Sequence, residues 1–214
     1  MKAILAKKVG MTQVFGDNGT LIPVTVLEAG PIVVTQKKTV ATDGYNAIQV
    51  GFGEVKEKRL NKPDKGRFDK VNVPYKKLVK EFKVENPDDY ELGAVIDASI
   101  FANGEKVDVS GLSKGKGYQG AIKRWGQHRG PMTHGSKYHR HAGAMSGATD
   151  PGKVKKGKRL PGHMGHVRIT VQNLTIVRAD GEKNLILLKG AVPGAKGTVL
   201  TIKQTVKIVK SKKA

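Results

Sequence analysis

Residues 114–168 read KGKGYQGAIKRWGQHRGPMTHGSKYHRHAGAMSGATDPGKVKKGKRLPGHMGHVR. This stretch holds 13 Lys or Arg residues, 12 glycines, all six histidines of the chain and one acidic residue, Asp150. No apolar period of 3.6 or 2 continues through it, so it lacks the side chains for a hydrophobic core of its own. We therefore expect a non-globular extension that takes its order from a partner. Because nearly all its charges are positive, the expected partner is a polyanion, and nucleic acid fits best.

The flanking segments carry a different balance of charge. The whole chain has 214 residues and a formal net charge of +21, yet residues 1–113 hold 17 basic and 15 acidic groups. Residues 169–214 hold nine basic and two acidic groups. The excess charge lies in the extension and the C-terminal segment, which predicts a globular body that carries a cationic extension.

Composition excludes several classes of protein and site. The chain has no cysteine, so it forms neither disulfides nor a thiolate metal site. It has no apolar run of the roughly 20 residues that a membrane span needs. The first ten residues contain three lysines and resemble no secretory signal. We expect a cytoplasmic protein with no membrane partner.

Strand patterns flank the extension on both sides. Apolar and β-branched runs occur at 3–9, 21–27, 32–35, 45–50, 167–177, 184–188 and 198–202. Turn signals such as Gly16-Asp17-Asn18-Gly19 and Gly30-Pro31 separate the first of them. Short strands at this spacing predict an antiparallel barrel or sandwich. The extension is then an insertion between two strands of one body.

Residues 54–94 differ in composition from these strands. The segment is rich in charge, and Pro74 stands where a helix can begin. Apolar residues follow at i, i+3, i+4 and i+7, the stripe of a short amphipathic helix: Tyr75, Leu78, Val79 and Phe82. We therefore predict a small α-containing insert that packs on the barrel.

Two glycine-rich motifs in the extension imitate nucleotide-binding loops. Residues 115–120 match G-x-G-x-x-G, but a turn precedes them, and the next acidic residue, Asp150, lies too far downstream to bind a ribose. Residues 152–159 resemble a phosphate loop, with Arg159 where Ser or Thr would bind Mg²⁺. Neither motif predicts a cofactor or nucleotide hydrolysis. Glycines beside cations do suit the backbone phosphates of RNA.

The histidines of the extension do not form a recognisable metal motif. Five are candidate ligands: His134, His139, His141, His163 and His166. Their spacings match no standard zinc pattern, and no cysteine or carboxylate pair accompanies them. Neutral histidines that stack on nucleotides or bond to them explain the pattern better. With Asp150 as its only carboxylate, the extension offers no general acid and base pair, so we predict no metal, no catalytic residue and no enzyme activity.

Three aromatic residues, Tyr118, Trp125 and Tyr138, interleave with the cations of the extension. Rings among cations are typical of surfaces that stack on bases or sugars. For Trp125 an alternative stays open, because its indole can instead pack the base of the extension against the barrel.

Several blocks of the sequence resemble one known family. Residues 8–15 read KVGMTQVF, residues 114–120 read KGKGYQG, residues 161–165 read PGHMG, and residues 184–194 read NLILLKGAVPG. In this order, and over essentially the whole chain, they resemble the large-subunit ribosomal protein three family of the bacterial type.

The resemblance implies a mainly β fold, with a translation-factor-like antiparallel β-barrel, a small α-containing insert and a long basic non-globular extension. The implied body is 1–112 and 169–214, with the insert at 54–94, and the implied extension is 113–168. The implied function is that of a structural constituent of the large ribosomal subunit, a primary rRNA-binding protein near the 3′ end of 23S rRNA that nucleates subunit assembly. The extension is expected to reach towards the peptidyl transferase centre. Large-subunit proteins fourteen and nineteen are the implied neighbours, and neither a cofactor nor a small-molecule substrate is implied.

The predicted rRNA-binding residues are basic, aromatic and histidine side chains of the extension. They are Lys114, Lys116, Tyr118, Lys123, Arg124, Trp125, His128, Arg129, His134, Lys137, His139, Arg140, His141, Lys153, Lys155, Lys156, Lys158, Arg159, His163, His166 and Arg168. Two other classes of function stay open on the residues alone. An architectural DNA-binding protein or nucleic-acid chaperone would use the same cations on a regular duplex, and a nucleotide-dependent enzyme would use the glycine loops.

Overall fold

The computed structural model describes residues 2–16 and 18–207. Asp17 of the expected turn and residues 208–214 of the basic C-terminal segment lie outside the described residues. The chain divides into two compact units, Met1–Leu112 with Arg168–Ala214, and Ser113–Val167. We call the first unit the body and the second the arm. No helix in the described part of the chain is long and apolar enough to cross a membrane.

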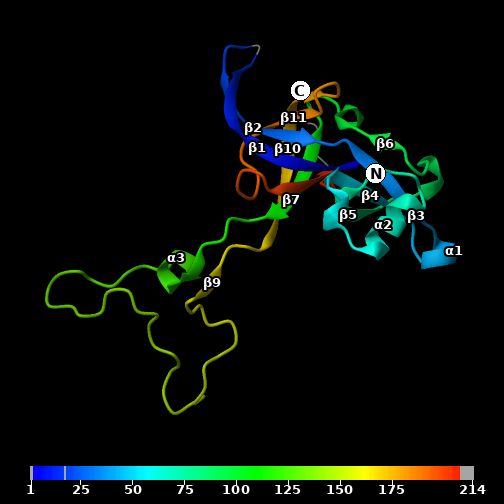
Figure 1. Ribbon diagram of the computed structural model, residues 1–214. Coiled ribbons are helices and arrows are strands. Elements are labelled where there is room, and N and C mark those ends of the chain that lie inside the picture. The colour runs from blue at the N-terminus through cyan, green and yellow to red at the C-terminus, as the bar shows by residue number, and fades with distance from the viewer. Residues whose placement is uncertain (1, 17, 208–214) are drawn as a thin grey trace. The chain divides into compact units, whose positions relative to one another are not determined.

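Six strands of the body close into a barrel in which each pair of neighbours is antiparallel (Figure 1). Their order around the barrel is β1 (Ala3–Phe15), β12 (Val199–Gln204), β7 (Lys106–Leu112), β10 (Arg168–Asp180), β11 (Leu185–Lys189) and β2 (Leu21–Ala29). The strands come from both sides of the arm in the sequence. The barrel confirms the predicted mainly β fold and decides between barrel and sandwich.

Alternation along the strands places the core of the body. Ile4, Leu27, Val109, Ile186 and Ile202 have no exposed surface, and they come from five different barrel strands. Burial of an aliphatic side chain of this size contributes roughly 1.5–3 kcal/mol to stability. The body thus has its own source of stability, without the arm.

A second sheet in the body has the order β5 (Lys76–Lys83), β4 (Ala47–Glu54), β3 (Ile32–Lys38) and β6 (Val95–Ile96). The predicted helix at residues 75–82 is therefore wrong. Leu78 and Phe82 fit helical spacing, but they are also an even number of residues apart, as strand alternation requires. Antiparallel pairing with β4 along the whole of β5 decides for the strand.

The helices of the chain are short. Those of the body are α1 (Val40–Asp43), α2 (Lys62–Asp69), η1 (Glu57–Arg59), η2 (Pro87–Asp89) and η3 (Ala98–Ile100), where η marks a 3₁₀ helix. α2 begins after Asn61 with Pro63 in its first turn, and Phe68 near its end is buried. The helix of the expected insert thus lies at residues 62–69.

The arm contains little regular structure. Strands β8 (Gly117–Gln119) and β9 (Gly162–Met164) pair antiparallel, and α3 (Ala121–Trp125) follows β8. Between α3 and β9 the chain follows two loops, residues 126–143 and 144–161 (Figure 1). The structure describes every residue of the arm, and among them Ala121 alone is buried. The arm therefore has no hydrophobic core.

Candidate nucleic-acid interface

The two ends of the arm are held together by a short antiparallel neck. The backbone N–H of Ser113 donates to the carbonyl of Val167 at 2.9 Å, and that of Lys116 donates to Met164 at 2.9 Å. Gly165 has a φ of +74°, and a Cβ at this position would collide with the carbonyl oxygen of Lys114. Only glycine tolerates both the positive φ and the close contact, so the approach of the two segments of the neck requires glycine at this position.

Trp125 connects α3 to the returning chain of the arm. Its Nε1–H donates to the carbonyl of Leu160 at 2.9 Å, and the Nη1 of Arg124 donates to the same oxygen at 2.9 Å. The guanidinium carbons of Arg124 and Arg159 lie 4.9 and 5.9 Å from the indole centroid. Cation–π contacts of this kind stabilise by about 0.5–1 kcal/mol at exposed sites. Trp125 thus closes the neck, while 43% of its surface remains exposed.

The first loop of the arm is shaped by hydrogen bonds to its own backbone. The N–H of Gly130 donates to the carbonyl of His139 at 2.8 Å, and the Nδ1 of His139 donates to Pro131 at 3.0 Å. The hydroxyl of Tyr138 donates to the carbonyl of His141 at 3.1 Å, and the centroids of the Tyr138 and His141 rings lie 5.3 Å apart. His139 and His141 therefore have a structural part in the loop. No group of three His, Asp or Glu side chains in the described residues is arranged to hold a metal ion.

The second loop carries four lysines, and its backbone contacts are few. The Nζ of Lys158 donates to the carbonyl of Ala144, and a single bridge joins Ala148 to Pro151. Among the described residues, no ion pair includes any residue of the arm. The cations of the arm are therefore not paired with any carboxylate of residues 2–16 and 18–207.

The sequence matches known ribosomal proteins over nearly its whole length. Residues 77–184 match the family model described as Ribosomal protein L3. A protein of Agathobacter rectalis named large ribosomal subunit protein uL3 is 58% identical over 222 residues, which cover 96% of this chain and 98% of that protein. A protein of Acetivibrio thermocellus with the same name is 59% identical over 207 residues, with 96% and 98% covered. The chain belongs to the ribosomal protein L3 family.

Membership of the L3 family confirms the resemblance found in the sequence. The family is one of structural ribosomal proteins, so the chain is not an enzyme. Strand β7, and not the predicted turn, ends shortly before residues 115–120, but it is antiparallel to both its neighbours, whereas the dinucleotide motif follows a parallel strand. Residues 117–119 form β8, and no strand leads directly into residues 152–159.

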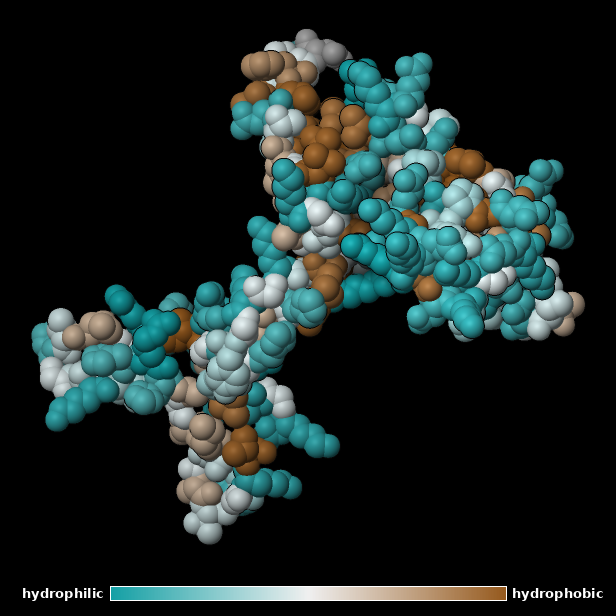
Figure 2. All heavy atoms as spheres, in the orientation of Figure 1, coloured by the Kyte–Doolittle hydropathy of each residue, from teal (hydrophilic) through white to brown (hydrophobic). Residues whose placement is uncertain are grey.

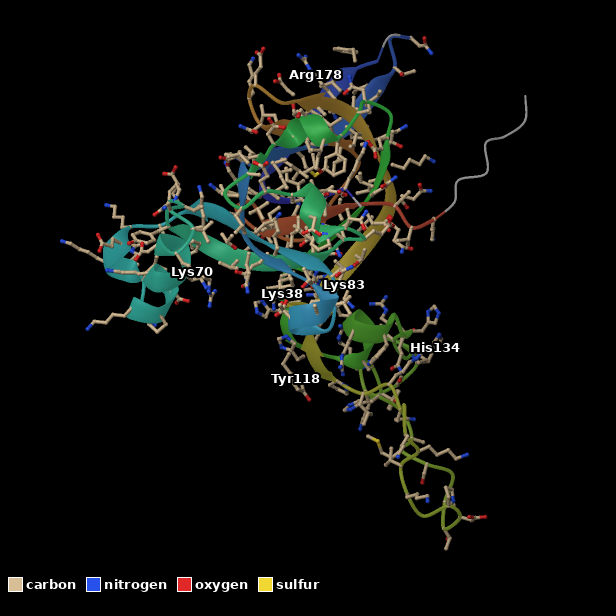
Figure 3. The ribbon with its side chains drawn as sticks, turned by 90° about the vertical axis from the view of Figure 1, so that its right-hand side faces the viewer. Lys38, Lys70, Lys83, Tyr118, His134 and Arg178 are labelled. Atoms are coloured by element: carbon tan, nitrogen blue, oxygen red, sulfur yellow. The ribbon has the colours of Figure 1, made fainter. Side chains whose placement is uncertain are left out.

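Within this member of the L3 family, the predicted contact residues are almost all exposed. Only Arg124 and His139 are half-buried, the first beneath the indole and the second inside the first loop. Figure 3 shows the side chains of Tyr118 and His134 pointing away from the arm backbone. Arg168 lies in the body, as the first residue of β10. The prediction included no other body residue, although strand alternation places cations such as Lys203 on the outside of the barrel.

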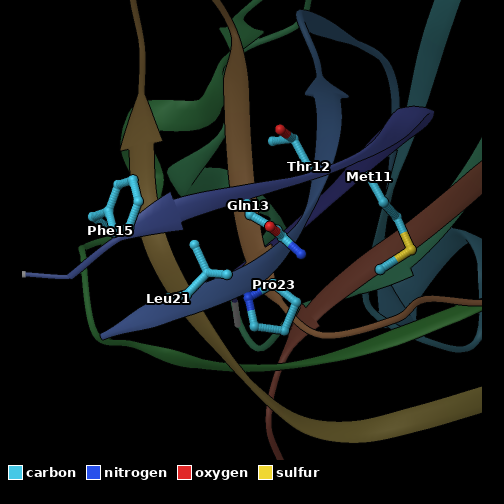
Figure 4. Close-up of a pocket in the computed structure, with 6 residues that line it drawn as sticks. All are labelled: Met11, Thr12, Gln13, Phe15, Leu21 and Pro23. Atoms are coloured by element: carbon cyan, nitrogen blue, oxygen red, sulfur yellow. The ribbon is translucent and has the colours of Figure 1, made fainter. Parts of the chain in front are cut away.

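The hairpin of β1 and β2 presents a different kind of surface. Phe15 is 80% exposed, and Met11 and Leu21 are about half exposed. Together with Thr12, Gln13 and Pro23 they line a shallow depression (Figure 4). On the face shown in Figure 2, hydrophobic side chains gather around this hairpin. The sequence has no Lys or Arg between residues 9 and 36, so this surface does not have the character of an RNA contact.

Proposed function

We propose that the chain is a structural constituent of the large ribosomal subunit in the cytoplasm and that its arm binds rRNA. The observation that carries the proposal is the set of exposed arm cations, none of which has an ion-pair partner in the part of the chain that the structure describes. A unit with a single buried residue and unpaired positive charge gains order and neutralisation together when it binds RNA. The residues proposed as contacts are those predicted from the sequence.

The proposed mechanism of binding is structural and involves no covalent chemistry. Lys and Arg side chains neutralise phosphates and release counterions, so the logarithm of the affinity falls by about 0.7–0.9 per contact per decade of salt. Glycines let the chain pass where a Cβ would collide. Exposed rings such as Tyr118 and the free part of Trp125 stack on unpaired bases.

We further propose the site of binding and the neighbours that the L3 family resemblance implies. The RNA is the region near the 3′ end of 23S rRNA, where early binding nucleates subunit assembly, and the arm reaches towards the peptidyl transferase centre. Large-subunit proteins fourteen and nineteen are the proposed protein neighbours. The exposed apolar end of the hairpin supports a protein contact, because no Lys or Arg lies between residues 9 and 36.

The test is binding of the full chain to a folded 3′-terminal transcript of large-subunit rRNA over a series of salt concentrations. The variant replaces the four lysines of the second loop by glutamine: Lys153, Lys155, Lys156 and Lys158. The expected result is weaker binding and a salt slope lower by about 3. The matched control replaces four exposed body lysines: Lys56, Lys58, Lys62 and Lys70. Equal slopes for the two variants would contradict RNA binding by the arm.

Competition with duplex DNA separates this function from that of a DNA-binding protein. At matched salt, folded rRNA is expected to displace the chain from duplex DNA. The loops of the arm present aromatic rings and backbone groups that can contact unpaired bases, and they contain no helix that could enter the groove of a duplex. Stronger binding to the duplex would favour the architectural alternative.

A further inference from the structure

A row of hydroxyl groups crosses the outer face of the barrel. Thr201 on β12 pairs with Ser110 on β7, which pairs with Thr170 on β10. Their sequence neighbours Leu200, Ile202 and Val109 are buried in the core, so the hydroxyl side chains point outward. The Oγ of Ser110 lies 2.8 Å from the Oγ1 of Thr170. The row thus places three hydroxyls on the outer side of three neighbouring strands, with Ser110 bonded to Thr170 and with Thr201, only 3% exposed, covered.

Three cations surround this row. Lys80 comes from β5 of the second sheet, and its Nζ donates to the Oγ1 of Thr201. Lys203 follows Thr201 by two residues and Arg168 precedes Thr170 by two, so both share the outward face. The Nζ of Lys203 lies 5.7 Å from the ring of Phe82, beside Lys80 on β5. The packing of β5 against β12 therefore brings the three positive groups into one neighbourhood.

None of the three cations of this cluster takes part in an ion pair among the described residues. Asp108 is opposite Lys203 in the strand register, but its carboxylate accepts the backbone N–H groups of Asn173 and Val206. Partial burial and the charges of Arg168 and Lys203 lower the pKa of Lys80 to about 8. The positive charge of Lys80 in this cluster therefore destabilises the folded chain.

The spacing of the cluster suits a chain of anions. Lys203 and Arg168 are two strands apart and offset by four residues, which corresponds to roughly 16 Å between their Cα atoms. One phosphate can contact both side chains only if they extend towards each other, whereas successive phosphates of a nucleic-acid strand can each contact one of them. Hydroxyl groups between the cations supply further hydrogen bonds to phosphate oxygens.

We propose that Lys80, Lys203 and Arg168, with the hydroxyls of Ser110 and Thr170, form a second RNA-backbone site, on the outer wall of the barrel. The inference rests on the proposed function in taking RNA as the partner, and it extends the contact from the arm to the body. A role of Lys80 in joining the two sheets through Thr201 does not by itself explain the cluster. An uncharged donor would make that bond without facing Lys203 and Arg168.

The test uses the full chain, the same rRNA transcript and the double variant Lys80→Gln/Lys203→Gln. Its matched control is Lys58→Gln/Lys62→Gln, which removes the same charge from an exposed part of the body. The site predicts a fall in the salt slope of about 1.4–1.8 for the first variant and none for the control. An unchanged slope for Lys80→Gln/Lys203→Gln would overturn the site, provided that the arm variant still loses affinity. No loss in either the arm or the cluster variant would instead overturn the proposed function.

A second measurement on the unaltered chain guards against a variant that fails to fold. Lysine amines are acetylated with a water-soluble active ester, free and at saturating RNA, and each site is quantified by mass spectrometry. Acetylation of Lys80 and Lys203 is expected to slow at least severalfold with RNA, while Lys58 and Lys62 react as before. Equal rates at Lys80 with and without RNA would overturn the site. In a folded Lys80→Arg variant, which keeps the charge, the salt slope is expected to stay unchanged.

Discussion

The body and the arm of this chain are ordered by different interactions. In the body, strands from both ends of the sequence close around fully buried side chains such as Ile4 and Leu27. In the arm, Ala121 is buried, and the order of the loops comes from hydrogen bonds to the backbone. Every ion pair found among the described residues lies in the body. The body pairs part of its charge internally, whereas no cation of the arm has an ion-pair partner among the described residues.

The largest expected effect separates the two units by stability. Leu27→Ala removes a side chain with no exposed surface from the barrel and is expected to lower the free energy of unfolding by about 2–5 kcal/mol. The arm variant without the lysines at 153, 155, 156 and 158 is expected to unfold at the same denaturant concentration as the unaltered chain. Chemical denaturation followed by circular dichroism measures both. A large loss of stability in the arm variant would show that the arm contributes to the fold of the body.

The next effect tests whether the neck shapes the arm. Gly165→Ala places a Cβ against the carbonyl of Lys114 at a positive φ, a strain of order 1–3 kcal/mol. We expect faster amide exchange at Lys116, weaker RNA binding and an unchanged unfolding midpoint of the body. The control is Gly120→Ala, where φ is −66° and no atom lies within 4 Å of the added Cβ. Equal exchange at Lys116 in the two variants would contradict the structural part given to Gly165.

The two units also differ in what their sequence reveals. The barrel strands are predictable because alternation of side chains is a local pattern, and the arm is predictable because its composition leaves nothing to bury. The helix predicted at residues 75–82 is wrong because the spacing of Leu78 and Phe82 fits both a helix and a strand. Pairing with β4, which is distant in sequence, determines that the segment is a strand. Lys80 and Lys203 of the cation cluster, unlike Arg168, are missed for the same reason. Lys80 and Thr201 are 121 residues apart, and only the packing of one sheet on the other brings them together.

The third prediction concerns the pH dependence of that cluster. The pKa of Lys80 is about 8 in the folded chain and 10.5 for an ordinary lysine, so the unfolded state binds the proton more tightly. The destabilising effect of this charge is complete below pH 8 and disappears as the pH rises to 10.5. Lys80→Met lacks the titration, so its stability relative to the unaltered chain is expected to fall over this range. Thermal unfolding at pH 7 to 10.5 measures it, and a constant difference over this range would contradict the lowered pKa of Lys80.

The smallest expected effect is at an ion-pair group on the second sheet, which shows the opposite electrostatic arrangement. The Nζ of Lys38, labelled in Figure 3, lies 2.9 Å from the carboxylate of Glu81 and donates to the hydroxyl of Tyr45 at 3.1 Å. Hydrogen bonds from Lys38 and Tyr45 lower the pKa of Glu81, and those to Glu81 and Tyr45 raise that of Lys38. Here the charge is satisfied within the chain, as it is not at Lys80 or in the arm.

Lys38→Met is therefore expected to lower the stability of the body slightly and to leave the salt slope of RNA binding unchanged. Exposed ion pairs are weak and are screened by salt, so the loss should shrink as salt is added. It should also shrink in acid, because a carboxylate with a lowered pKa stabilises the fold above its ordinary pKa and loses that contribution as pH falls through the lowered value. Thermal unfolding from pH 6 to pH 3 at two salt concentrations measures both trends. A change in the RNA salt slope equal to that of Lys80→Gln/Lys203→Gln would contradict this expectation. Ion-paired and unpaired cations of the body would then bind RNA alike, and the absence of an ion pair would no longer identify the RNA-binding surface.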